Sequence, residues 1–375
     1  MKNQITLLII ALTIYLLLHS VNSVANELKP ETLKVLTWEG YVTEKDISHV
    51  NQLLLDQGYQ YQVEVISVFA EGAEQMYNLI RANECDITFL TLFFIKMKNE
   101  QTAKLLQPVN VQSPRLTNYK LLYPNLTRLK MGLDKSHNPL YIPWGGGIYG
   151  FYIDYNRVEQ SSLPHSVKDL WTPKWRHKFS LNKAQEWYNI GLTLMSQGES
   201  PFYLYEEFMK ENRTGVMVKS ALDGVFQTQL TALYDAAGSF WADAPTFDDE
   251  LLIVSSWGPE IHAENAKGGN WQLINFDEGH MAWLDTINFV KGLSDRKLEA
   301  AEIFANYFIG KEVQTRISEQ LSMVPASKHV PVNVTIGDPD KILNENMFVP
   351  PYDQRSYGLM KKMLEQAKGH RRADH

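Results

Sequence analysis

The sequence predicts an α/β protein in which mainly parallel strands alternate with covering helices, arranged as two domains. The chain has 375 residues, more than the usual size of one domain, about 150 residues. Strand-like and helix-like segments alternate in its N-terminal third, the order that produces a parallel sheet with flanking helices. No flexible linker separates two halves, so we expect the domains to share several crossing strands.

Two hydrophobic periods alternate in the N-terminal third. Ile47, Val50 and Leu54 recur at helical spacing, whereas apolar and polar residues alternate over 61–65. In open parallel sheets ligands lie beyond the carboxyl ends of the strands, so we expect residues 38–41 to lie near a binding site. The predicted elements are strands at 33–38, 61–65 and 85–90 and helices at 47–54, 73–80 and 93–106.

The rest of the chain contains a second set of elements. Three glycines, Gly145, Gly146 and Gly147, precede an extended run. They lack the Lys-Ser/Thr of a phosphate-binding loop, so we interpret them as a tightly packed backbone crossing. The predicted elements are strands at 148–153, 251–257 and 283–290 and helices at 186–197, 296–309 and 311–321.

Charge and motifs exclude several classes of function. The 36 Lys and Arg residues and 43 Asp and Glu residues give a net charge of −7, which disfavours nucleic-acid binding and mildly favours a cationic ligand. Cys85 is the single cysteine, so we expect no intrachain disulfide or cysteine zinc site. We expect no cofactor, no metal and no enzymatic activity, because catalytic motifs are missing. An exported hydrolase that uses paired cleft carboxylates is the alternative.

The first 25 residues have the layout of a secretory signal peptide. Lys2 precedes an apolar run over 5–18, and the small residues Ser23 and Ala25 follow a more polar stretch. The run is shorter than the roughly 20 residues that span a membrane. We therefore expect export, cleavage near Ala25 and a periplasmic mature protein.

Tryptophan and tyrosine residues repeatedly stand beside acids. A carboxylate supplies charge and acceptors for an ammonium group, and an aromatic face adds cation–π attraction and covers methylene groups. This pattern favours an aliphatic ammonium ligand, whereas the alternative is that the aromatics are core and the acids are surface residues. The groups lie at 38–41, 186–188, 241–243, 257–260 and 283–285.

The order of these motifs resembles that of the periplasmic polyamine-binding proteins. That family includes the spermidine/putrescine-binding components of ABC uptake systems and the norspermidine sensor proteins of the same fold. The resemblance extends over nearly all of the mature chain. It is carried by residues 36–42 (LTWEGYV), 84–87 (ECDI), 142–145 (IPWG), 167–175 (VKDLWTPKW) and 278–285 (EGHMAWLD).

The resemblance implies a two-lobed periplasmic binding protein of type II, with two α/β lobes joined by a hinge that the chain crosses several times. We expect 26–146 and 286–325 to form the first lobe, and 147–285 and 326–375 the second. It further implies a monomer that captures spermidine, norspermidine or putrescine by cleft closure. The closed form would be presented to an ABC permease or to a membrane GGDEF/EAL sensor that controls biofilm formation.

The resemblance also implies the ligand-binding residues. Trp257 and Trp283 match two tryptophans that sandwich the aliphatic chain, Asp285 matches the central acid, and Glu186 matches an acid that holds an amine. Asp243 and Gln354 align more loosely. The complete set is Trp38, Glu39, Tyr41, Glu186, Asp243, Trp257, Trp283, Asp285 and Gln354.

Four positions depart from the family pattern. Gly40 stands where the family usually has an acid, which places Glu39 one residue too early. Leu90 and Leu92 replace hydroxyl residues, and Lys183 replaces an acid. These departures leave the preferred polyamine open.

Overall fold

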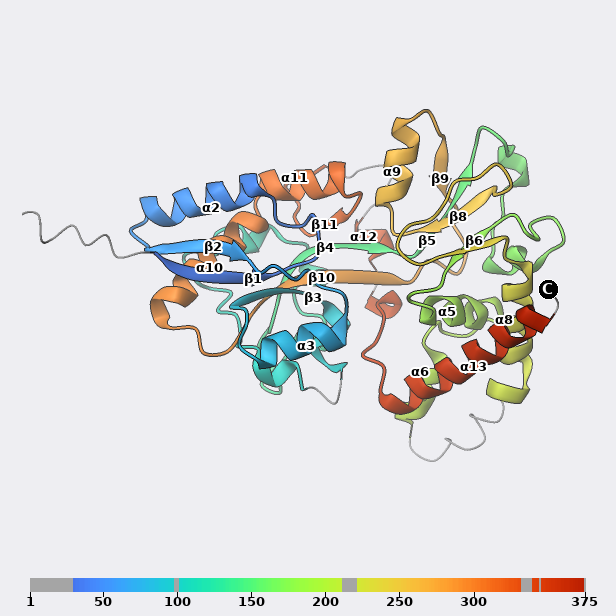
Figure 1. Ribbon diagram of the computed structural model, residues 1–375, viewed down its shortest axis with the longest axis horizontal. Coiled ribbons are helices and arrows are strands. Elements are labelled where there is room, and N and C mark those ends of the chain that lie inside the picture. The colour runs from blue at the N-terminus through green and yellow to red at the C-terminus, as the bar shows by residue number, and fades with distance from the viewer. Residues whose placement is uncertain (1–29, 98–100, 211–220, 332–338, 344, 374–375) are drawn as a thin grey trace, which may run out of the picture.

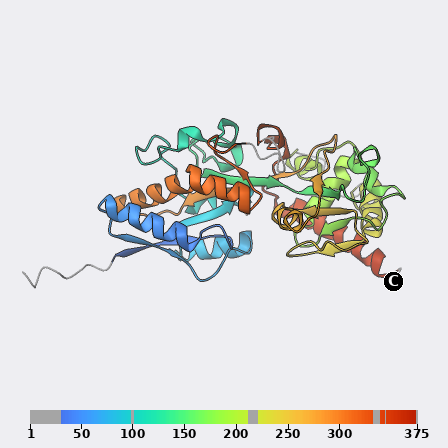
Figure 2. The same cartoon turned by 90° about the horizontal axis from the view of Figure 1, so that it is seen from above.

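The computed structural model describes residues 30–97, 101–210, 221–331, 339–343 and 345–373. Two lobes lie side by side along the longest axis of the molecule (Figures 1 and 2). Each lobe combines sheet and helices, so the predicted two-lobed α/β fold is confirmed. The predicted signal peptide lies outside the described residues.

The first lobe is built on a six-stranded sheet with the strand order β11-β4-β10-β3-β1-β2. Strand β1 pairs in parallel with β2 and β3, whereas β10 runs antiparallel to both β3 and β4. The strands are β1 (Glu31–Leu36), β2 (Tyr61–Val65), β3 (Ile87–Thr91), β4 (Ile142–Ile148), β10 (Ala282–Phe289) and β11 (Val324–Pro325). The helices of this lobe are α2 (Glu44–Asp56), α3 (Ala73–Arg81), α10 (Asp295–Phe308) and α11 (Lys311–Gln320).

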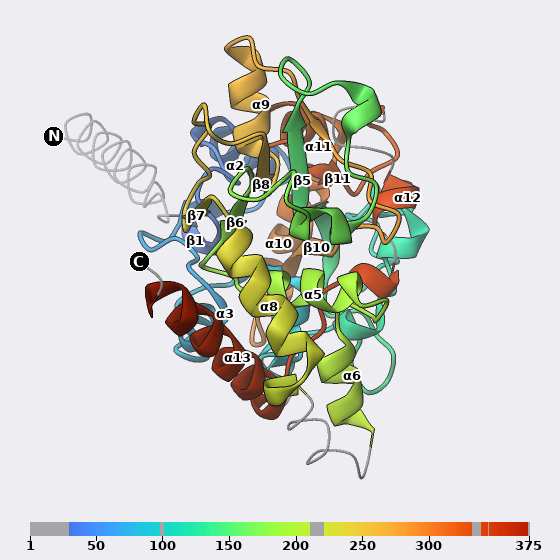
Figure 3. The same cartoon turned by 90° about the vertical axis from the view of Figure 1, so that its right-hand side faces the viewer.

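The second lobe has two smaller sheets. Strand β5 (Gly150–Asp154) runs antiparallel to β8 (Ile253–Ser256) and β9 (Trp271–Leu273), while β6 (Ser180–Asn182) is parallel to β7 (Ser239–Trp241). Helix α13 packs along α8 on the outer side (Figure 3). The helices are α5 (Trp187–Ser196), α6 (Tyr203–Met209), α8 (Val225–Ala236), α9 (Pro259–Ala266) and α13 (Gln354–Ala373), with α12 (Pro339–Ile342) between the lobes.

Two details of the sequence prediction were wrong. The sheets are not mainly parallel, because β10 returns from the second lobe and enters the first sheet against the direction of its neighbours. Strands buried on both faces have the same apolar pattern in either direction, so the sequence did not distinguish them. The described part of the helix expected over 93–106 contains two 3₁₀ helices, Leu92–Ile95 and Ala103–Leu105, and residues 98–100 of that range lie outside the described residues.

The lobes are connected through β4 and β10. Strand β4 leads through Tyr149 into β5, and β10 begins its pairing with β4 at Ala282, opposite Ile148. The expected lobe boundaries at 146 and 285 therefore fall inside these strands. After β11, the backbone of Ala326 and Lys328 still bonds to residues 121–123 of the first lobe, before the chain reaches α13.

The three glycines of β4 allow this crossing to pack closely. A Cβ on Gly146 would lie 2.6 Å from the Trp283 carbonyl oxygen, and one on Gly147 would lie 2.7 Å from the Trp283 indole ring. A Cβ on Gly145 would lie 2.8 Å from Ile317 Cδ1. The structure thus supports the packed-crossing interpretation and fixes the indole of Trp283 against the strand between the lobes.

We expect Gly147→Ala to destabilise the protein. The added methyl group collides with the Trp283 ring, and overpacking of this kind costs about 1–3 kcal/mol. Thermal melting of the protein without ligand measures the effect. Gly369→Ala is the control, because no atom lies within 4 Å of that site on α13; equal melting temperatures for the two variants would contradict the packing argument.

Candidate ligand-binding site

A cavity of 880 Å³ lies between the two lobes. Rings from the two sides approach across it, since the centroids of Phe93 and Trp187 are 6.5 Å apart. No lysine or arginine appears among the described residues that line it, which include the acids Glu71, Glu74 and Asp353. The lining residues are Trp38, Glu71, Gly72, Ala73, Glu74, Gln75, Phe93, Phe94 and Met97 from the first lobe, and Ala184, Gln185, Trp187, Tyr352, Asp353, Gln354 and Tyr357 from the other side.

Asp285 is a buried carboxylate in the middle of β10. It lies opposite Thr91 of β3 and Gly145 of β4, and it is 3% exposed. Its Oδ2 accepts a 2.5 Å hydrogen bond from the Tyr41 hydroxyl, while its Oδ1 is buried without a hydrogen-bond partner. Among the described residues no cationic side chain forms an ion pair with it. Burial raises the pKa of Asp285 to about 6, against the lowering effect of the Tyr41 and Thr91 hydroxyls.

Tyr41 is held as a hydrogen-bond donor to this carboxylate. Its ring centroid lies 4.3 Å from that of Trp144 and 6.0 Å from that of Phe89. Burial raises the pKa of the Tyr41 phenol well above its usual value, and the negative charge of Asp285 raises it further. The hydroxyl therefore keeps its proton and donates to Asp285 at physiological pH.

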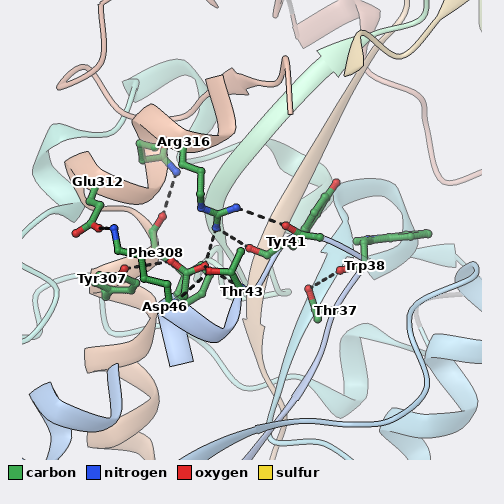
Figure 4. Close-up of polar contacts among 12 residues, drawn as sticks. Thr37, Trp38, Tyr41, Thr43, Asp46, Tyr307, Phe308, Glu312 and Arg316 are labelled. Atoms are coloured by element: carbon green, nitrogen blue, oxygen red, sulfur yellow. Dashed lines mark hydrogen bonds and ion pairs between the residues drawn. The ribbon is translucent and has the colours of Figure 1, made fainter. Parts of the chain in front are cut away.

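A polar network fixes the loop that carries Trp38 and Tyr41 (Figure 4). Arg316 of α11 donates from Nη2 to the Tyr41 carbonyl at 2.8 Å and to Asp46 Oδ2 at 2.9 Å. Asp46 forms a capping box with Thr43 at the start of α2. The guanidinium of Arg316 thereby links the backbone of the loop to the acid at the start of α2.

Gly40 explains one departure from the family pattern. It turns the loop between Trp38 and Tyr41 with a φ of +80°, a conformation that glycine adopts without strain. Its carbonyl accepts a 3.4 Å hydrogen bond from Arg316. The acid expected at this position is thus replaced by a residue that the turn favours.

The second lobe contributes an aromatic cluster around Trp257. Its ring centroid is 5.1 Å from Tyr149, 5.0 Å from Tyr188 and 6.1 Å from Trp241. Burial raises the pKa of Tyr188 well above its usual value, and the charges of Tyr352 and Asp285 raise it further. Neither Trp257 nor Asp285 is among the residues that line the 880 Å³ cavity.

Several buried polar atoms near the lobe interface have no partner among the described residues. They are Nε1 of Trp38, Trp187 and Trp283 and Oδ1 of Asp285. Buried polar groups in folded proteins are nearly always paired, so such a group of exceptions needs an explanation. Three indole N–H donors and one carboxylate acceptor are available here to a ligand.

The structure separates the other predicted residues into three groups. Gln354 and Trp38 line the interlobe cavity. Glu39 and Asp243 are exposed and do not line it. Glu186 lines a smaller neighbouring cavity of 190 Å³, where its carboxylate accepts a 2.8 Å hydrogen bond from Tyr234 and pairs with Lys368.

The structure also shows where the other three residues that depart from the family pattern lie. Leu90 and Leu92 are buried core residues, whereas the hydroxyl of Thr91 between them lies opposite Asp285. Lys183 is exposed. Inspection of positions 90 and 92 alone therefore missed the hydroxyl at position 91, which strand alternation directs to the other face.

Many residues that line the 880 Å³ cavity are not among the predicted site residues. Phe93 and Phe94 were expected in a helix, and Glu71 and Glu74 were not considered, although one precedes α3 and the other lies in its first turn. Tyr352 and Tyr357 come from the C-terminal segment, and only the fold brings them to the cleft.

Comparison with known proteins identifies the family. Residues 74–349, more than half of the chain, match the family model described as bacterial extracellular solute-binding protein. The chain belongs to this family. No curated protein is similar enough to this solute-binding protein to count as a match.

Solved structures share its fold at low sequence identity. The spermidine/putrescine ABC transporter substrate-binding protein of Streptococcus pneumoniae has a TM-score of 0.70 at 17% identity, covering 91% of this chain and 99% of its own. A lipoprotein of Treponema pallidum has a TM-score of 0.67 at 13% identity (90% and 99% covered). The iron-bound HitA of Pseudomonas aeruginosa has a TM-score of 0.55 at 15% identity (91% and 99% covered). The shared fold thus accommodates different ligands.

Within the described part of the chain, no helix has the length and apolar character needed to cross a membrane. The family and the fold are those of proteins that bind solutes outside the cytoplasm.

We expect Arg316→Met to destabilise the protein strongly. Asp46 is 3% exposed, and removal of the guanidinium leaves this carboxylate buried without its cation, a loss of about 3 kcal/mol. Chemical denaturation measures it. Lys45→Met is the control, because the Lys45–Glu312 pair is exposed and should change stability little; a similar loss in both variants would refute the anchoring role.

We expect Asp285→Asn to change how stability depends on pH. The pKa of Asp285, about 6, lies above that of a free carboxyl, so ionisation of this side chain lowers stability as pH rises from about 4 to about 7. The Asn variant escapes this loss and should gain up to about 3 kcal/mol over wild type by neutral pH. Melting temperatures without ligand test this, with the exposed Asp243→Asn as control. A difference that does not vary with pH would contradict it.

Proposed function

We propose that this solute-binding protein captures a small aliphatic polyamine of the spermidine, norspermidine or putrescine type between its lobes. The observation that carries the proposal is the Asp285 carboxylate, buried without a cation among the described residues and with Oδ1 unpaired. Burial of an uncompensated charge is costly, and a ligand ammonium supplies both the opposite charge and N–H donors.

The surroundings favour an aliphatic chain between the charged groups. Trp38 lines the interlobe cavity, Trp283 packs against Gly147 of the crossing strand β4, and Trp257 belongs to the aromatic cluster of the second lobe. Indole rings suit methylene groups and cation–π contacts. The acids Glu71 and Glu74 add negative charge to the cavity wall. The shared fold of the spermidine/putrescine-binding protein of Streptococcus pneumoniae agrees with this proposal.

The proposed mechanism is capture without chemistry. Export by the predicted signal peptide would place a monomer in the periplasm, where the lobes close on the ligand about β4 and β10. The closed form is then recognised by a membrane partner, either an ABC permease or a GGDEF/EAL sensor that controls biofilm formation. Neighbouring genes for permease and ATPase subunits favour the first partner, and a neighbouring gene for a GGDEF/EAL protein favours the second.

The test is a calorimetric and thermal-shift screen of putrescine, spermidine and norspermidine on residues 26–375, refolded to remove bound polyamine. We expect at least one polyamine to bind and to raise the melting temperature, since a ligand that binds only the folded state stabilises it by about 2.7 kcal/mol at a hundredfold excess over Kd. A response to an amino acid, a sugar or ferric iron with no response to polyamines would refute the proposal.

The Asp285 carboxylate should control this affinity. Asp285→Asn should weaken polyamine binding at least about tenfold at pH 7.5. Wild-type affinity should fall as pH drops below about 6, because a proton then competes with the ligand for Asp285 while the amines stay charged. Retained affinity in the folded Asn variant would show that the carboxylate is not the ligand acid.

A further inference from the structure

Glu186, expected from the sequence to hold a ligand amine, is already engaged inside the protein. Its Oε1 accepts a 2.8 Å hydrogen bond from the Tyr234 hydroxyl of α8. Its Oε2 lies 2.7 Å from Nζ of Lys368 on α13. Both oxygens of this acid therefore have partners without any ligand.

The pair lies in a small cavity that adjoins the interlobe cavity. Glu186 and Lys368 line the 190 Å³ cavity, which shares Ala184, Trp187 and Tyr357 with the 880 Å³ cavity between the lobes. The side chain of Glu186 is 13% exposed and that of Lys368 is 30% exposed, so the ion pair is partly shielded from water. The Lys368 ammonium thus already stands beside Glu186, where a ligand ammonium paired with this acid would lie.

We propose that Lys368 is a tethered ammonium that occupies the Glu186 subsite and restricts the ligand to short polyamines. The inference rests on the proposed function and specifies the ligand class within it. A diamine needs Asp285 and the aromatic surfaces, whereas a longer triamine must displace Lys368 to use Glu186. A tethered group competes at an effective concentration of about millimolar or more, so this displacement weakens triamine binding.

Lys183 and Lys368 both place positive charge near this small cavity, while Glu365 beside Lys368 carries a negative charge. The exposed Lys183 stands one residue before Ala184, which lines both cavities. Lys368 is also held by Glu365 of the same helix at 3.1 Å, which keeps its ammonium near Glu186. Both lysines disfavour a further cation in this small cavity.

The experiment compares the affinities of spermidine and putrescine, measured by calorimetry, in the full mature chain. The selectivity is the spermidine affinity divided by the putrescine affinity. We expect Lys368→Met to raise this selectivity at least tenfold, because Glu186 becomes free for a third amine. The double variant Lys368→Met, Glu186→Gln should lose that gain, since the freed acid is then neutral.

Matched variants distinguish the effect of the Glu186–Lys368 ion pair on selectivity from the effect of removing any positive charge on α13. Lys362→Met removes a charge from the same helix outside both cavities and should leave the selectivity unchanged. Lys368→Arg preserves the cation and should retain the wild-type selectivity. Should Lys368→Met not fold, Lys368→Gln replaces it with the same expected rise.

Each outcome is decisive. An unchanged or lower selectivity in the folded Lys368 variants, or a gain that survives Glu186→Gln, overturns the inference while polyamine binding itself stands. Failure of wild type and Lys368→Met alike to bind either polyamine overturns both the inference and the proposed function.

Discussion

The buried carboxylate of Asp285 is the constraint around which the site is arranged. Strand β10 lies between β3 and β4, so a charge at its centre cannot reach water. The Tyr41 hydroxyl satisfies one oxygen and leaves the other directed at no described partner. The Tyr41 hydroxyl stays beside Asp285 only if the loop that carries it is rigid. Arg316 of α11 holds this loop by donating a hydrogen bond to the Tyr41 carbonyl.

The connecting strands join this charge to both lobes. The glycines of β4 let Trp283 pack against the backbone beside Asp285. Trp257 approaches from the second lobe through its contacts with Tyr149 and Tyr188. The acid and the aromatic surfaces thus stand on elements that the crossing strands β4 and β10 connect.

The family fold does not by itself determine the ligand, because solved structures of the same fold are described with ligands as different as polyamines and iron. Evidence on the kind of ligand therefore comes from the residues that line the cleft. Indole rings and carboxylates with no lining lysine or arginine, among the described residues, suit an organic cation. The Glu186–Lys368 pair shows that counting acids is insufficient, since a carboxylate that a lysine already neutralises is not available to a ligand.

The sequence by itself determined the α/β class, the family resemblance, and the strands and helices of the first lobe except β4 and β11; in the second lobe it predicted β5, β8 and α5 but not α6, α8, α9 or α13. These features are local: hydrophobic periods report burial of one face, and short motifs are contiguous in the chain. The tertiary structure alone decided the antiparallel direction of β10, the contribution of Thr91, the exposure of Glu39 and Asp243, and the pairing of Glu186 with Lys368 across 182 positions of the chain. Strand direction and partner choice depend on contacts between distant segments, and the pattern of residues along one segment does not encode which distant side chain will meet it.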